Sequence, residues 1–100
     1  MKIKVIGDEF ACIGFALLGV STVSVEDKES VEKEFEKALK EDDLGIILIT
    51  ENEAELIRDK ITKQKTKGQL PLVVEIPGRS GWKERGKALE LFKKVLMIKI

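Results

Sequence analysis

The chain has 100 residues, of which 43% are hydrophobic and 36% charged, and this composition is typical of one ordered globular domain. Basic and acidic residues number 18 each, so the positive excess expected of a nucleic-acid-binding protein is absent. No histidine is present, which excludes a His-based catalytic triad and imidazole metal ligands.

The first third of the sequence predicts strand, helix and strand. Residues 2–6 form a short β-branched run that ends at Gly7-Asp8, as a strand entering a turn does. Apolar residues at helical spacing follow as far as Gly19, which suits the left-handed conformation that ends helices. Residues 21–25 then alternate polar and apolar side chains. The apolar residues of the predicted first helix are Phe10, Ile13 and Leu17, with Gly14 between them.

A second helix is expected after Asp27 or Ser30, either of which can cap it. Its apolar residues recur on one stripe among lysines and glutamates, so one face should pack on the core and the other should be solvated. The stripe consists of Val31, Phe35, Ala38 and Leu39.

The middle of the chain predicts the central strand of a parallel sheet, because residues 46–49 are continuously aliphatic. Thr50 and Glu53 have the spacing of a capping box, which predicts a third helix beginning at Glu51. Ala54, Ile57 and Ile61 supply its buried stripe.

A fourth strand is predicted over residues 70–76, with Pro71 at its beginning and Pro77-Gly78 closing it. The alternation of strands and helices predicts an α/β fold, namely a small doubly wound, mostly parallel four-stranded sheet of order 2-1-3-4, plus a C-terminal helix. The predicted compact α/β domain spans 1–78, and residues 79–100 form the hinge and C-terminal helix.

The tail leaves three alternatives open. Leu89, Phe92 and Leu96 would share one face of a helix, which either packs on the chain's own sheet or docks on a partner; the apolar residues 95–100 could instead form a fifth strand. Trp82, the only tryptophan, could anchor an interface or cover an edge of the core.

Three groups of residues were compared with known catalytic or ligand-binding motifs. Residues 81–88 have the spacing of a phosphate-binding P-loop, but Ala88 stands where Ser or Thr would hold magnesium, so we expect no nucleotide there. Asp8 and Glu9 resemble the acidic pair of response-regulator receivers, yet Thr50-Glu51 replaces the phosphoaccepting aspartate, and capping by Asp8 is favoured. Cys12 is interpreted as a small buried hydrophobic residue.

Charge and cysteine content bear on partners and compartment. Residues 26–43 contain nine acidic residues and four lysines, whereas 79–99 contain seven basic and two acidic residues, an asymmetry that either orients a partner or marks solvated helix faces. The lone cysteine and the lack of a secretory or membrane-spanning run favour a cytoplasmic protein, associated with membranes only through partners.

Four segments together resemble the F subunit of the archaeal and vacuolar-type (A-type and V-type) rotary ATPases. They are Ile3–Asp8, Gly14–Val20, Gly45–Glu51 and Pro71–Gly78. Members of that family often carry arginine or lysine after Gly7-Asp8, where this chain has Glu9.

This resemblance implies a non-catalytic subunit of the central stalk with no cofactor and no catalytic or metal-binding residue. Its compact domain would bind the coiled-coil D subunit, and its C-terminal helix would reach the catalytic head subunits A and B, coupling or regulating rotation. Within that helix, Trp82, Leu89, Phe92 and Leu96 are the expected partner-binding residues. A degenerate receiver-like signalling module is the alternative.

Overall fold

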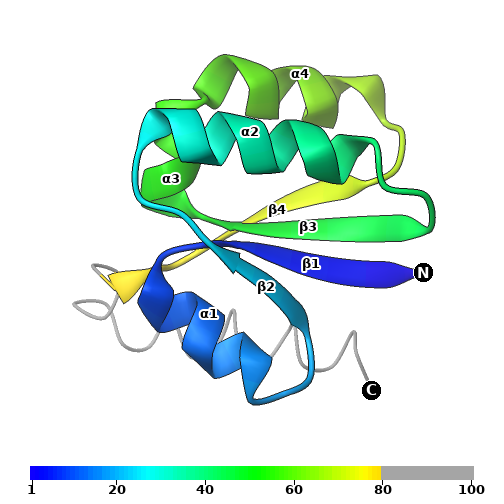
Figure 1. The fold of residues 1–100 in the computed structure, drawn as a ribbon. Helices are drawn as coiled ribbons and strands as arrows, with labels where there is room; N and C mark the ends of the chain where they lie inside the picture. The colour runs from blue at the N-terminus through cyan, green and yellow to red at the C-terminus, as the bar shows by residue number, and fades with distance from the viewer. Residues whose placement is uncertain (80–100) are drawn as a thin grey trace.

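The computed structural model describes residues 1–79, and these form one parallel α/β sheet with helices on both faces (Figure 1). Four strands lie in the order β2-β1-β3-β4, as predicted, and every neighbouring pair is parallel. They are β1 (Lys2–Gly7), β2 (Ser21–Ser24), β3 (Leu44–Thr50) and β4 (Leu72–Ile76). The prediction of a doubly wound sheet is therefore confirmed for the described residues.

The helices divide unequally between the faces. Helix α1 (Glu9–Ala16) packs on one face, over β1 and β2, while α2 (Lys28–Leu39), α3 (Glu51–Leu56) and α4 (Arg58–Lys67) pack on the other (Figure 1). Consecutive strand residues point to opposite faces, so Val5 belongs to the core under α1 and Ile6 to the core under α2. The inner strand β3 contributes side chains to both cores, as its aliphatic run predicted.

Helix α1 ends earlier than the sequence suggested, at Ala16, and Gly19 has the predicted left-handed backbone with φ of 81°. The side chains that α1 buries are Ala11, Cys12 and Phe15. Phe10, Ile13 and Leu17, which carried the helical spacing in the sequence, are exposed. The periodicity located the helix correctly, but these residues lie away from the core.

Helix α2 forms where it was predicted, and Asp27 is its N-cap. Asp27 accepts a hydrogen bond from the Ser30 N–H at 2.8 Å, and Ser30 Oγ in turn accepts from the Asp27 N–H, so the two form one capping box. Val31, Phe35 and Ala38 are fully buried, and Leu39 packs at the margin of the same core.

The predicted third helix is divided in two. It begins at Glu51 as expected, but Ile57 has φ −129° and ψ 39°, which interrupts the helical backbone between α3 and α4. The break lets Ala54, Ile57 and Ile61 all remain buried. The fourth strand starts at Leu72 rather than Leu70, because Pro71 cannot donate to a strand ladder.

Candidate functional site

The carboxyl ends of β1 and β3 meet at the point where the chain turns to opposite faces of the sheet, and sheets of this kind bind ligands there. Three residues meet at this edge: Asp8 follows β1, Thr50 ends β3, and Gly78 follows β4. A ligand site of this fold would therefore be built from these residues.

Asp8 is already hydrogen-bonded on both carboxylate oxygens. Oδ1 accepts from the Ala11 N–H at 2.8 Å, which confirms the predicted cap of α1, and Oδ2 accepts from the Arg79 N–H at 2.8 Å. The second bond joins residues that lie 71 positions apart. A Cβ at Gly78 would overlap Oδ2, so glycine there makes room for the carboxylate.

Thr50 fills the rest of this edge. Its side chain is fully buried, and a Cβ built at Gly7 would lie 2.6 Å from Thr50 Cγ2. The predicted capping box is wrong: Thr50 makes no bond to the backbone of α3, and its Oγ1 instead donates to Glu53 Oε1. Burial explains the change, because the hydroxyl points into the protein and finds the Glu53 carboxylate there.

This arrangement bears on the receiver-like alternative. A receiver uses free carboxylates at this edge, whereas Asp8 holds two backbone amides and Thr50 is buried. Among residues 1–79, no three acidic or cysteine side chains are grouped to hold a metal ion. Cys12 is buried as predicted, its Sγ 3.3 Å from the Val23 carbonyl oxygen, and burial raises the pKa of the thiol.

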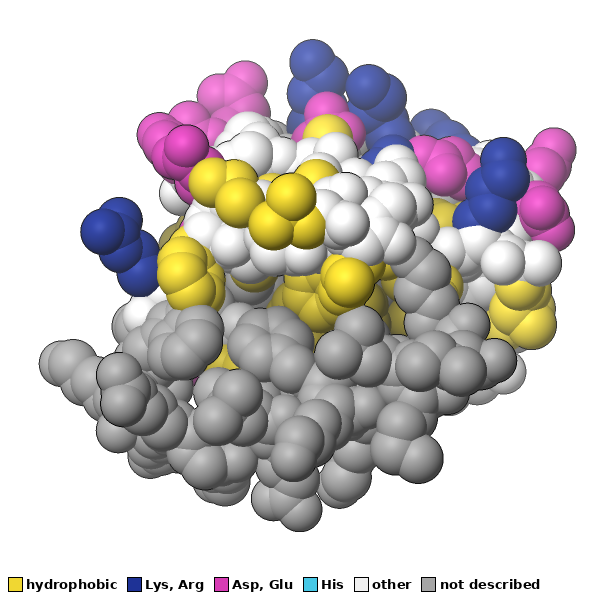
Figure 2. All heavy atoms as spheres, turned by 90° about the horizontal axis from the view of Figure 1, so that it is seen from below, with side chains coloured by type: hydrophobic (Ala, Val, Ile, Leu, Met, Phe, Trp, Pro, Cys, Tyr) yellow, Lys and Arg dark blue, Asp and Glu magenta, His cyan; other side chains and the backbone are white. Residues whose placement is uncertain are grey.

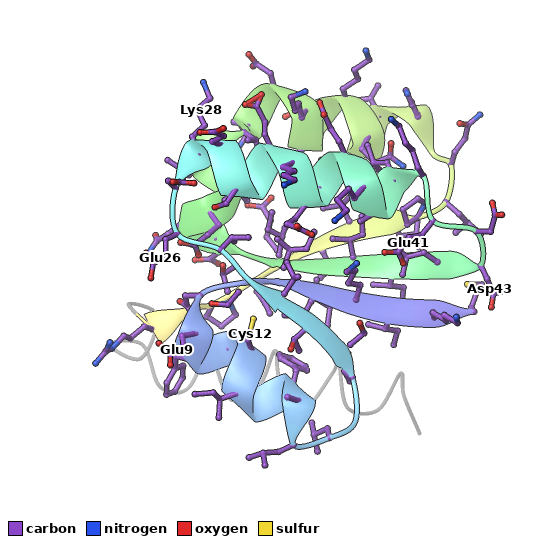
Figure 3. The ribbon with its side chains drawn as sticks, in the orientation of Figure 1. Glu9, Cys12, Glu26, Lys28, Glu41 and Asp43 are labelled. Carbon is purple, nitrogen blue, oxygen red and sulfur yellow. The ribbon has the colours of Figure 1, made fainter. Side chains whose placement is uncertain are left out.

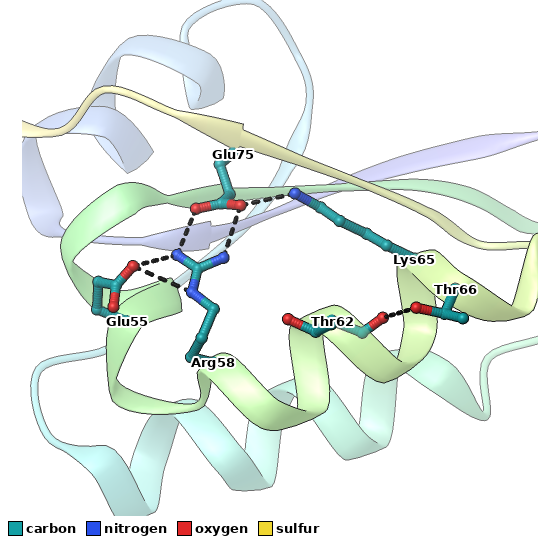
Figure 4. Close-up of polar contacts among 6 residues, drawn as sticks. All are labelled: Glu55, Arg58, Thr62, Lys65, Thr66 and Glu75. Atoms are coloured by element: carbon teal, nitrogen blue, oxygen red, sulfur yellow. Dashed lines mark hydrogen bonds and ion pairs between the residues drawn. The ribbon is translucent and has the colours of Figure 1, made fainter.

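A second polar cluster lies at the junction of α3, α4 and β4 (Figure 4). The Arg58 guanidinium donates to both oxygens of Glu75, at 2.9 and 2.7 Å, and also to Glu55; Lys65 donates to Glu75 at 2.6 Å. The hydrogen bond from Arg58 is the main cause that lowers the pKa of Glu75 from 4.5 to about 2. The cluster ties the edge strand β4 to α4 and occupies both carboxylate oxygens of Glu75.

The outward side of α1 is unusually apolar. Glu9 is the only charged residue of this helix, while Phe10 is 42%, Ile13 56% and Leu17 83% exposed. Figure 2, which views this face, shows apolar side chains gathered in front and charged ones toward the rim. Figure 3 shows the Cys12 sulfur on the opposite side of α1, toward the strands.

The opposite face of the molecule contrasts with it. Lysines and glutamates of α2 line a shallow depression there, and Lys60 of α4 is paired with Glu36 of α2. A surface of alternating charges is typical of a solvated helix face. The acidic stretch 26–43 therefore supplies one strongly hydrated side of the domain.

The partner-binding residues predicted from the sequence, Trp82, Leu89, Phe92 and Leu96, lie outside the described residues, as does the P-loop-like segment 81–88. The division between a compact domain, 1–78, and a tail, 79–100, also stays a prediction. Within residues 1–79, none of the helices combines the length and apolar character needed to cross a bilayer.

Sequence reasoning missed the bond between Asp8 and Arg79. A signal for it does exist, because Gly7-Asp8 and Pro77-Gly78 each follow a strand of the same parallel sheet. Parallel strands bring such turns to one edge, where glycines allow close approach of the chain.

Comparison with known proteins extends over nearly the whole sequence. The family model described as ATP synthase (F/14-kDa) subunit matches residues 3–95. The F subunit 1 of the V-type proton ATPase of Drosophila melanogaster is 42% identical over 89 residues, which cover 77% of this chain and 70% of the relative. The A-type ATP synthase F subunit of Methanocaldococcus jannaschii is 35% identical over 98 residues, covering 96% and 95%, and that of Thermococcus kodakarensis is 32% identical over 106 residues, covering 100% and 98%.

Proposed function

The chain belongs to the family described as ATP synthase (F/14-kDa) subunit, and from this membership we propose that it is a non-catalytic subunit of the central stalk in an A-type or V-type rotary ATPase. The observation that carries the proposal is the match over residues 3–95, because it includes both the described α/β domain and most of the tail. ATP synthesis or hydrolysis would take place on other subunits.

The carboxyl edge of the sheet supports a structural role. Here Asp8 and Thr50 bond or pack within the chain, and Gly7 and Gly78 make room for them. Such an edge suits a subunit that transmits force, because Asp8 and Thr50 would have to give up these internal bonds to bind a ligand.

In the proposed complex, the compact domain binds the coiled-coil D subunit of the stalk. The tail reaches the catalytic head subunits A and B through Leu89, Phe92 and Leu96, with Trp82 near the hinge. Differential contacts of the tail with the head would favour one rotary state over another and so couple or regulate rotation. The subunit would lie on the cytoplasmic side of the membrane and be attached to it only through the complex.

The tail assignment is tested by Leu89→Ser together with Phe92→Ser. We expect the double variant to keep the α/β fold by circular dichroism and to enter the complex, but to weaken the regulation of ATPase activity. A matched control, Leu56→Ser, alters an exposed leucine of α3 and should leave that regulation unchanged. Normal regulation in the double variant would reject the role of these residues.

A separate test addresses the receiver-like alternative. Isothermal titration of the isolated chain with Mg²⁺, and with Mg²⁺-ATP, should give no heat of specific binding if the chain is an accessory subunit. Saturable Mg²⁺ binding that Asp8→Asn abolishes would favour the receiver-like module instead.

A further inference from the structure

Strand β2 forms one edge of the sheet, and within residues 1–79 no further strand pairs with its outer side. The Val25 N–H donates to the Gly7 carbonyl at 2.9 Å, so Val25 and Val23 turn their backbone groups toward β1. The direction of these groups alternates along a strand, and the N–H and C=O groups of Thr22 and Ser24 therefore point away from the sheet. These four groups are free to bond another strand.

The two edges of the sheet are protected differently. At the other edge, Pro71 and Pro77 stand immediately before and after β4, and Glu75 of this strand is bonded to Arg58 and Lys65. Prolines, charged side chains, bulges and short length all hinder the pairing of an edge strand with another chain. Of these devices, β2 has only its short length: its sequence is Ser-Thr-Val-Ser, and its pairing with β1 has no bulge.

Strand β2 can pair with a second copy of itself in antiparallel orientation. A two-fold axis perpendicular to the sheet allows the outward-facing residues to pair, with Thr22 opposite Ser24 of the second copy and Ser24 opposite its Thr22. This register forms four backbone hydrogen bonds and places Val23 opposite Val23 of the second copy, a β-branched cross-strand pair. Val23 is only partly buried at the margin of the core under α2, and no like charges are opposed.

Helix α1 favours a second copy over an unrelated strand. It packs over β1 and β2, so pairing of two β2 strands would separate it from α1 of the second copy by two strand spacings, about 10 Å. Packed helices lie about 8–10 Å apart. Glu9 is the only charged residue of α1, and the side facing the second helix would therefore be mostly apolar. Only another copy of this chain brings such a helix at that distance.

We propose that the free chain associates with a second copy through β2, with Val23 at the two-fold axis, and that the two four-stranded sheets become one continuous sheet. The strand pair is small, since β2 has four residues, so the association is weak and depends on concentration. The proposal concerns the free chain and does not depend on the stalk assignment.

Disulfide formation tests the register. In a Cys12→Ala background, which leaves no other thiol, Val23→Cys should cross-link two chains about tenfold faster than Ser24→Cys. Opposite residues have Cβ atoms about 4.5–5.5 Å apart, close to the distance that a disulfide spans, whereas Ser24 and Ser24 of the second copy are diagonal neighbours about 7–8 Å apart. Equal rates for the two variants would contradict the register.

Sedimentation equilibrium of the full chain tests the association itself. The average mass of wild type should rise from one chain toward two as the concentration rises. Thr22→Pro, which removes an outward N–H, and Ser24→Lys, which adds a charge to the edge, should both abolish the rise. Leu72→Lys, at an exposed position of β4, is the matched control and should associate as wild type does. The mass of one chain at every concentration, or equal association of the Ser24→Lys and Leu72→Lys variants, would overturn the proposal.

Hydrogen exchange identifies what covers the edge. The amides of Thr22 and Ser24 should exchange more slowly as the concentration of the chain rises, whereas the Val23 amide, which faces β1, should change little. Slow exchange at Thr22 and Ser24 that does not depend on concentration would mean that the chain's own residues cover β2, and the proposal would be wrong.

Discussion

Gly7 and Gly14 differ in the space that their surroundings leave for a methyl group. A Cβ at Gly7 would press on Thr50, whereas a Cβ at Gly14, in the middle of α1, would meet no atom of residues 1–79 within 4 Å apart from its own helix backbone and chain neighbours. The resemblance to the family drew attention to both positions, but only contacts across the sheet distinguish a glycine that needs space from one that does not.

Alanine substitution tests this difference. Gly7→Ala should destabilise the protein by about 1–3 kcal/mol, because the buried Thr50 has no room to move. Gly14→Ala should stabilise it by about 0.5–1 kcal/mol through better helix propensity. Urea denaturation measures both; a stable Gly7→Ala variant would mean that the packing at the carboxyl edge is looser than described.

Glu75 provides a pH-dependent contribution. Its pKa is lowered to about 2 in the folded protein, chiefly by the hydrogen bonds from Arg58, so its stabilising effect is complete above pH 4.5 and is lost as pH falls toward 2. Glu75→Gln should therefore reduce the free energy of unfolding at pH 7 by about 1–2 kcal/mol, after allowance for the partial exposure of the carboxylate. The variant should also lose less stability than wild type as the pH falls from 4.5 toward 2. Glu55→Gln, which alters the more exposed carboxylate, is the control. An equal loss of stability between pH 4.5 and pH 2 in wild type and in Glu75→Gln would refute this role.

At the scale of elements, sequence periodicity predicted where helices and strands occur better than what each side chain does. Asp27 and Thr50 both precede helices at capping spacing, but only Asp27 caps. Thr50 lies at the end of a buried inner strand, and its hydroxyl bonds to Glu53 instead. The same limit applies to α1, because a short helix with few polar residues offers no pattern from which its buried face can be predicted.

The capping box of α2 supplies the prediction at this scale. Asp27→Ala should lower the urea midpoint, since the Ser30 amide loses its acceptor, whereas Asp27→Asn should change it little. Thr50→Ala makes a useful comparison, because its effect should come from lost packing and the lost bond to Glu53 rather than from a missing cap. An Asp27→Ala variant as stable as wild type would contradict the box.

At the scale of the whole molecule, strand order was predictable because right-handed crossovers and alternating elements leave few topologies. The contact between Asp8 and Arg79 was only partly predictable: the turns after β1 and β4 share one edge of the sheet, but the pattern does not indicate which carboxylate and which amide bond there. The sequence also predicted the solvated, charged side of α2, but no pattern in it indicated that the outward side of α1 is apolar. That difference gives the domain two unlike sides, as a subunit with a fixed orientation in a larger assembly requires.

The central claim is that this chain is a stalk subunit, and co-expression with a D subunit from the same genome tests it most directly. Size-exclusion chromatography with multi-angle light scattering then measures the mass of what the two chains form. We predict a stable one-to-one complex at physiological salt. Two separate peaks, each with the mass of one free chain, would contradict the assignment.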